Sequence, residues 1–182
     1  MSLIPINKTH LKTILIWRNS GVVRYSMFSQ QKISWEEHLN WFKKIHSSQL
    51  EKWFLFVNEK KVPSGVVYFK EIDLNKKKAE WGFYANPEAE SGTGMRMSLE
   101  AINYAFLEMG LEKIESSVLM SNQRSIAMHE KVGFSESNGI ANDARIRRFN
   151  LFSKDWPLKE KVLRRNIEEQ SKSKKRYRNL FE

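Results

Sequence analysis

The sequence predicts an α/β fold in which a mixed, mostly antiparallel central sheet is flanked by helices. Three observations lead to this prediction. Helical and strand-like segments alternate along the chain, a glycine-containing turn opens an amphipathic helix, and 182 residues suit one domain with its own core. Because the composition changes at about Lys154, we expect a domain over residues 1–152 and a basic helical extension over residues 153–182.

Two helices are expected before the first strands. Apolar residues recur at helical spacing between Lys8 and Asn19. A second helix begins after Ser34, because Ser34 and Glu37 have the spacing of a capping box. Its predicted apolar stripe consists of Trp35, Leu39, Phe42 and Ile45.

Three strand-like runs follow, and they are rich in aromatic and β-branched residues. They span residues 53–57, 62–69 and 79–85, with polar turns between them. The order of two helices and then three short strands favours hairpin pairing within this part of the sheet.

The next helix begins at a glycine-containing turn. Gly92-Thr93-Gly94 precedes apolar residues spaced 4-3-4-3, and Gly110 is suited to end the helix. A strand is expected over residues 113–120.

Another helix is capped by Asn122 and ended by Gly133, and closing strands follow at Phe134 and over residues 144–152. Pro157 is well placed to open a helix in the tail. Ten basic and five acidic residues between Lys154 and Glu182 give the tail half of the net charge of +10. We therefore predict a basic, poorly packed C-terminal helix that frays near its end.

Composition excludes several chemistries. The chain has no Cys, which removes disulfides, Cys-ligated zinc, iron–sulfur clusters and thiol nucleophiles. No apolar run approaches the roughly 18 residues of a membrane span, and no secretory signal precedes Asn19. These features predict a cytoplasmic protein without a metal site or a membrane partner. The net charge of +10 predicts an anionic partner without identifying it.

A strand that ends at Asn86-Pro87, followed by a Gly-x-Gly turn and a helix, suits an anion. Glycines let the main chain approach closely, and free N–H groups at a helix N-terminus bind phosphate. The pattern is neither a dinucleotide fingerprint nor a Walker sequence, because the third Gly and the Gly-Lys-Ser/Thr run are both absent.

A second motif makes the interpretation specific. Residues 122–134 read NQRSIAMHEKVGF. Together with the Gly-x-Gly turn, this segment resembles the GNAT superfamily of acetyl-CoA-dependent N-acetyltransferases, and the resemblance covers about residues 1–152. It implies a GNAT fold and acetyl-CoA as the acetyl donor. The implied CoA-binding residues are Phe83 and Ala85 through their backbone, Gly92, Thr93, Gly94, Met95, Arg96, Asn122 and Ser125.

Two positions depart from the family pattern. Ala89 stands where the family usually has Gln or Arg, and Arg96 is a candidate to compensate for the lost phosphate contact. His129 stands where many members have the Tyr that protonates the leaving thiolate. A histidine can donate a proton too, so the resemblance makes His129 a candidate general acid, although a buried structural histidine is the alternative.

The N-terminal half is similar to the PseH-type enzymes, which acetylate the 4-amino group of a UDP-linked 4-amino-4,6-dideoxy sugar on the route to pseudaminic acid. The similar segments are Trp17-Arg18-Asn19, Met27-Phe28, residues 37–42 and residues 80–87. The resemblance implies a nucleotide-sugar acceptor, for which the candidate contacts are Arg18, Met27, His38, Lys70 and Tyr84. Glu80 is a candidate to take the amine proton through water, with a cross-strand salt bridge to a Lys as the alternative.

Other functions remain open on the sequence. A RimJ/RimL-type acetyltransferase of protein N-termini is the alternative within the class, and a polyamine acetyltransferase suits the positive charge poorly. A basic nucleic-acid-binding module would leave residues 80–134 unexplained, so nucleic acid is disfavoured. A degenerate, non-catalytic fold and a homodimer are also left open.

Overall fold

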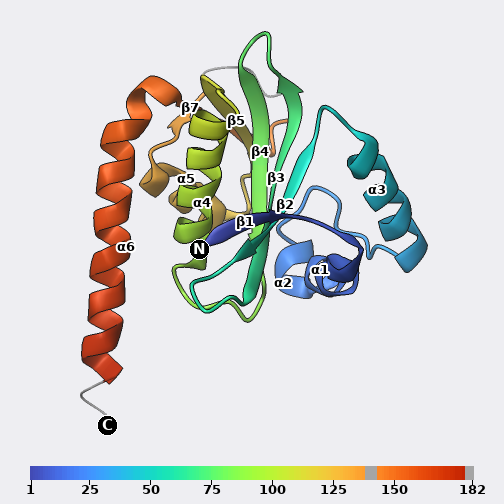
Figure 1. The fold of residues 1–182 in the computed structure, drawn as a ribbon, viewed down its shortest axis with the longest axis horizontal. Coiled ribbons are helices and arrows are strands. Elements are labelled where there is room, and N and C mark those ends of the chain that lie inside the picture. Colours follow the sequence, from blue (N-terminus) through green and yellow to red (C-terminus); the bar gives the residue numbers. More distant parts are fainter. Residues whose placement is uncertain (138–142, 179–182) are drawn as a thin grey trace.

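A seven-stranded mixed sheet with helices on both faces forms the described part of the protein in this computed structural model (Figure 1). The structure describes residues 1–137 and 143–178, with side chains as far as Ser173. The sheet order is β1-β2-β3-β4-β5-β7-β6, and the neighbouring strands are antiparallel except for β4 and β5. The strands are β1 (Ser2–Pro5), β2 (Lys52–Val57), β3 (Pro63–Asp73), β4 (Lys78–Ala85), β5 (Lys113–Leu119), β6 (Ser135–Glu136) and β7 (Ile146–Phe152).

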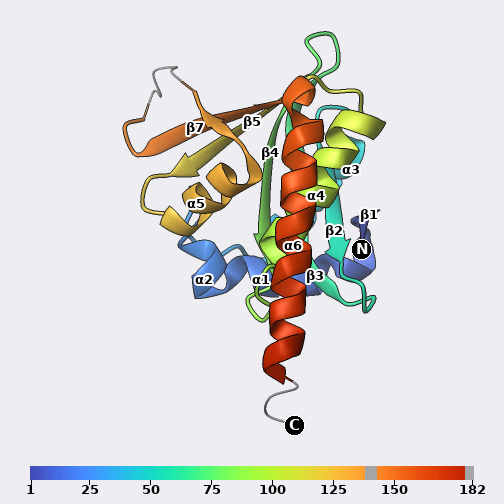
Figure 2. The same cartoon turned by 90° about the vertical axis from the view of Figure 1, so that its left-hand side faces the viewer.

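The helices form two layers. One side of the sheet carries α1, α2 and α3, and the other carries α4, α5 and α6 (Figures 1 and 2). Their bounds are η1 (Lys8–His10), α1 (Leu11–Asn19), α2 (Gly21–Arg24), α3 (Trp35–Ser47), α4 (Thr93–Asn103), the π-helical η2 (Tyr104–Glu108), α5 (Gln123–Val132), η3 (Ser153–Asp155) and α6 (Trp156–Arg178).

Each helical layer has its own hydrophobic core. Leu11, Ile14 and Phe42 pack on one face of the sheet with Leu55 and Val66. The larger core on the other face joins the inner sides of α4 and α5 to the sheet. Since successive strand residues point to opposite faces, the central strands β2 and β3 supply both cores.

The local signals in the sequence fix several helix ends. Ser34 Oγ accepts from Glu37 N, and Glu37 Oε2 accepts from Ser34 N at 2.6 Å, so the predicted capping box is confirmed. Asn122 Oδ1 accepts from Ser125 N at 3.1 Å. Gly133 ends α5 with a φ of 102°, a left-handed conformation that glycine adopts without strain.

Other predictions need correction. Trp35 is exposed, and His38 takes the inward position on α3 beside Phe42 and Ile45. Phe134 is buried in the core just before β6, which begins at Ser135. β1 and α2 are not predicted from the sequence, because each is only four residues long and has no periodic pattern.

The predicted poor packing of the C-terminal helix is wrong for the first half of α6. This helix lies along α4 and α5 (Figure 2). Trp156 and Leu163 are buried, and Trp156 Nε1 donates to Asn103 Oδ1 at 2.7 Å. The predicted fraying at the chain end lies outside the described residues. Within the described chain, no helix has both the length and the apolar character to cross a membrane.

The sheet divides between β4 and β5. These parallel strands pair only over Lys78–Glu80 and Lys113–Glu115. β3 pairs with β4 as far as Ala85, but no described strand pairs with the other edge of β4 after Glu80. An extended ligand can therefore approach that edge in the place of a strand.

Candidate functional site

A cleft of about 410 Å³, here called the large cleft, opens along the unpaired part of β4. Phe83, Tyr84 and Ala85 form its floor, and the Gly92–Met95 turn forms one end. Asn122 and Ser125 line it from α5, and Met27 lines it from the loop after α2. These elements are far apart in the sequence, and the division of the sheet brings them together.

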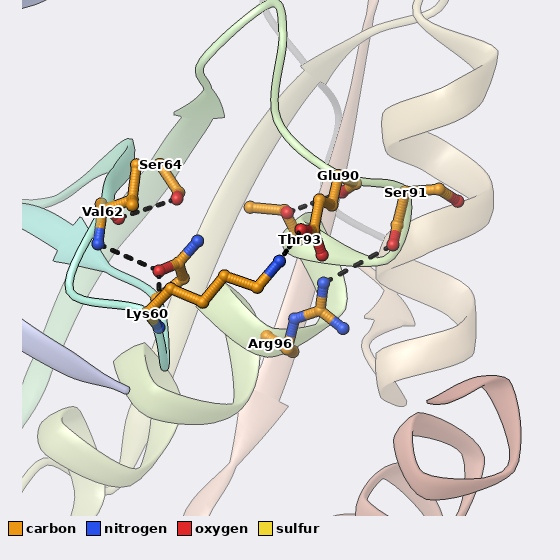
Figure 3. A network of polar contacts seen from close by, with 8 residues as sticks. Lys60, Val62, Ser64, Glu90, Ser91, Thr93 and Arg96 are labelled. Atoms are coloured by element: carbon orange, nitrogen blue, oxygen red, sulfur yellow. Dashed lines mark hydrogen bonds and ion pairs between the residues drawn. The ribbon is translucent and has the colours of Figure 1, made fainter. Parts of the chain in front are cut away.

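The glycine turn is held in place by polar contacts (Figure 3). Gly92 has a φ of 90°, and Thr93 Oγ1 donates to the Glu90 carbonyl at 2.6 Å. Lys60, at the β2–β3 turn, forms an ion pair with Glu90 at 2.8 Å. Arg96 Nη2 lies 3.5 Å from the Ser91 carbonyl, so the guanidinium is directed at the turn and does not line the large cleft. These contacts therefore hold the backbone at the N-terminus of α4, which lines the large cleft.

A second opening of about 60 Å³, here called the small cavity, lies where β4 and β5 separate. Glu80, Trp81 and Gly82 line it from β4, and Ser116 and Ser117 line it from β5. The large cleft and the small cavity share five lining residues: Ser26, Met27, Phe83, Asn122 and Ser125. The two openings thus meet at the point where the sheet divides.

His129 is buried beside the small cavity, and both of its ring nitrogens have partners. Its Nδ1 lies 2.7 Å from the Ser125 carbonyl, and its Nε2 lies 2.8 Å from Ser116 Oγ. Since a carbonyl only accepts, Nδ1 carries the proton, and in the neutral ring Nε2 accepts from the Ser116 hydroxyl. Burial lowers the pKa of His129, so the neutral ring is favoured.

Trp81 lies next to His129, with 5.7 Å between the two ring centroids. Its indole is 2 % exposed and lines the small cavity, and its Nε1 has no hydrogen-bond partner among the described residues. The ring stacks on Phe134 with a centroid distance of 5.5 Å. The rings of Trp81, Phe134 and Phe149 therefore surround the His129 imidazole.

Glu80 is the one acidic side chain that lines the small cavity in the described chain. Burial raises the pKa of its carboxyl, and the Ser117 hydroxyl opposes the rise. The predicted alternative, a salt bridge with a Lys, is wrong for the described residues. Lys70 lies opposite Glu80 in the sheet, but its Nζ stands 5.0 Å from the Tyr68 ring centroid and 5.2 Å from that of Trp53.

Tyr68 lies across the backbone of β4 because residue 82 is a glycine. A Cβ at Gly82 would stand only 2.2 Å from the Tyr68 hydroxyl oxygen. Burial raises the pKa of Tyr68 to about 12, so its hydroxyl stays protonated at neutral pH. Tyr68 lines the small cavity beside Glu80.

Three predicted acceptor residues line neither opening. Arg18 Nη2 donates to the Ser29 carbonyl at 2.9 Å, while Nη1 is buried without a hydrogen-bond partner among the described residues. Burial lowers the pKa of Arg18, and the neighbouring Tyr84 and Tyr68 hydroxyls oppose this effect.

His38 is 3 % exposed and donates from Nε2 to the Leu11 carbonyl at 3.0 Å, so its imidazole belongs to the core. Lys70 covers an aromatic pair, as described above.

Several residues that line the two openings are not predicted from the sequence. Ser26, Phe28, Tyr68, Trp81 and Ser116 line the small cavity. Arg124, Lys131 and Gln170 line the large cleft. The spacing of Arg124 and Lys131 on a predicted helix places them on one face, and that signal could have been used. Gln170 comes from α6 and had no local signal.

Comparisons with known proteins agree with this geometry. The family described as "Acetyltransferase (GNAT) domain" matches residues 1–135. The acetyltransferase PseH of Campylobacter jejuni is 28% identical over 129 residues, which is 71% of this chain and 79% of that protein. Its crystal structure with acetyl coenzyme A has a TM-score of 0.66 at 24% identity and covers 84% of this chain and 98% of that one. The structure of Vibrio cholerae spermidine N-acetyltransferase in complex with CoA and spermine has a TM-score of 0.77 at 21% identity. The match covers 86% of this chain and 97% of that one.

Proposed function

Because this chain belongs to the GNAT acetyltransferase family, we propose that it transfers an acetyl group from acetyl-CoA to the 4-amino group of a UDP-linked amino-dideoxy sugar. The observation that carries this proposal is the meeting of the large cleft and the small cavity where β4 and β5 separate. A donor in the large cleft and an amine in the small cavity would touch only there. Proximity and orientation at this point supply much of the rate enhancement.

The residues of the large cleft fit the donor. The free edge of β4 at Phe83–Ala85 offers backbone groups to an extended amide-containing chain, and the fixed turn at Gly92–Met95 suits a pyrophosphate. Asn122 and Ser125 border the junction. Acetyl-CoA supplies the acetyl thioester, and a β4 N–H near Phe83 stabilises the oxyanion that develops on its carbonyl.

The residues of the small cavity fit the proton transfers. Glu80, with its raised pKa, takes the proton of the incoming amine through water. His129 and Ser116 serve the leaving thiolate: the protonated form of the ring, which burial makes the minor one at neutral pH, donates from Nε2 to Ser116 Oγ, and the Ser116 hydroxyl proton passes to sulfur. No Cys is present, which excludes a thioester-linked acyl-enzyme on cysteine and agrees with direct transfer.

The charge distribution supports an anionic acceptor. Glu80 is the one acid at the small cavity in the described chain, whereas a polyamine site requires several. The similarity to PseH points to the same class of acceptor.

A coupled thiol-release assay with three acceptors tests the proposal. The acceptors are a UDP-4-amino-4,6-dideoxy sugar, a peptide with a ribosomal-type N-terminus and spermidine. We expect kcat/KM for the amino sugar to exceed that for the other two by about 100-fold, since a lost charge-assisted bond alone changes binding by about 10- to 100-fold. A higher kcat/KM for spermidine, as the similarity to the Vibrio cholerae enzyme would suggest, or for the peptide would overturn the assignment.

A further inference from the structure

One face of α5 presents two cations to the large cleft. Arg124, Ala127, Met128 and Lys131 all line the cleft. Their positions are i, i+3, i+4 and i+7, which fall on one side of a helix over two turns. Two positive side chains therefore flank a small apolar surface.

Neither cation is paired within the described part of the chain. Arg124 and Lys131 are exposed, and no ion pair or side-chain hydrogen bond engages them there. Neighbouring charges are already engaged: Glu130 lies 3.5 Å from Arg147, and Glu90, across the cleft, pairs with Lys60. The positive potential on this face of α5 is thus not neutralised by its neighbours.

The C-terminal helix contributes a side chain to the large cleft, at the glycine turn. Gln170 of α6 lines it, with its Nε2 3.7 Å from Met95 Sδ. A Cβ added at Gly92 would stand 3.2 Å from Gln170 Oε1, so the amide lies against the glycine turn. The extension thereby forms a wall of the cleft.

We propose that Arg124 and Lys131 hold the 3′-phosphate of CoA, that Ala127 and Met128 carry its adenosine, and that Gln170 borders the pyrophosphate. This inference rests on the proposed function, which assigns the large cleft to acetyl-CoA. CoA carries two separate anionic groups, a pyrophosphate and a ribose 3′-phosphate. The Gly92–Met95 turn can accept one of them, and the second needs cations of its own, which Arg124 and Lys131 supply on α5. The apolar strip between Arg124 and Lys131 gives the adenine ring a surface.

Calorimetric titration of the full chain with CoA and with 3′-dephospho-CoA tests the inference. We expect the wild type to bind CoA about 10-fold more tightly, which corresponds to about 1.4 kcal/mol. Arg124→Ala with Lys131→Ala removes this preference and leaves the Kd for 3′-dephospho-CoA unchanged. The matched control, Lys43→Ala with Lys44→Ala on α3, removes the same charge away from both openings and keeps the preference.

Gln170→Ala provides the second variant. It weakens both ligands by the same factor, because both contain the pyrophosphate, and the preference is retained. Melting curves of all variants check that they are folded.

The alternatives are distinguishable. A wild type that binds neither ligand overturns the proposed function and this inference together. Binding of CoA without a preference, or a preference that survives in the Arg124/Lys131 variant, overturns this inference and leaves the proposed function intact. Equal weakening of both ligands in that variant also overturns it, since the cations would then act on the shared pyrophosphate.

Discussion

At Glu80, the environment that suits a general base also opposes folding. Burial raises the pKa of the carboxyl, so the ionised form is less favourable in the folded protein than in the unfolded chain. The contribution of this group to stability is complete below its unfolded pKa and decreases as pH rises through the folded value. Near neutral pH, the charge therefore lowers stability.

Glu80→Gln is expected to separate the two effects. Without the base, kcat falls by about 100-fold, and the rising limb of the pH–rate profile, which lies above the ordinary Glu pKa, disappears. Removal of the buried charge raises the Tm at pH 7. Steady-state kinetics between pH 5 and 9 and thermal melts measure the two effects. Retained kcat would contradict the role of Glu80 as a base.

His129 raises a different question, because both ring nitrogens already have partners. If the ring supplies the thiolate proton through Ser116, His129→Phe lowers kcat far more than it raises the KM for acetyl-CoA. In the wild type, the protonated fraction of His129 decreases as pH rises through its pKa, which burial places below the usual 6.5. The contribution of His129 to kcat decreases with it. Ser116→Ala, which keeps the ring but removes the Nε2 partner, should lower kcat in the same way. An unchanged kcat in His129→Phe would remove the residue from the mechanism.

Among the elements, the C-terminal helix α6 contributes a buried side chain to the hydrophobic core of the domain. Leu163 is 1% exposed, whereas Leu158 on the same helix is 74% exposed. Leu163→Ala should lower the free energy of unfolding by about 2–5 kcal/mol, because it leaves a cavity in the core. Leu158→Ala is the matched control and should change it by less than about 0.5 kcal/mol. Urea denaturation of both variants measures the difference, and equal effects would show that α6 is not part of the core.

The elements also show which features the sequence could predict. Helix ends set by neighbouring residues, such as Ser34 with Glu37 and Asn122 with Ser125, were predictable because their signals are local. β1 was not, because its four residues gain their structure from pairing with Phe54–Val57. Gln170 contacts Met95 from 75 positions away, so no local pattern indicates that α6 borders the large cleft.

The predicted site shows the same limit. The Gly-x-Gly turn and the α5 motif lead to the large cleft, where Gly92, Asn122 and Ser125 all lie. For His38, the sequence left open whether the ring binds substrate or forms a hydrogen bond at the edge of the core. A helical position beside an apolar stripe does not show whether a backbone carbonyl, here that of Leu11, lies within hydrogen-bond distance of the ring. Ser116 and Trp81 were missed because they meet His129 only through tertiary contacts.

For the whole molecule, the division of the sheet between β4 and β5 has a kinetic consequence. The large cleft and the small cavity share five lining residues, and their remaining lining residues differ. We therefore expect that either substrate can bind first. Double-reciprocal plots should intersect, and product CoA should compete with acetyl-CoA but act as a mixed inhibitor against the amine. Parallel lines would instead indicate a covalent acyl-enzyme intermediate.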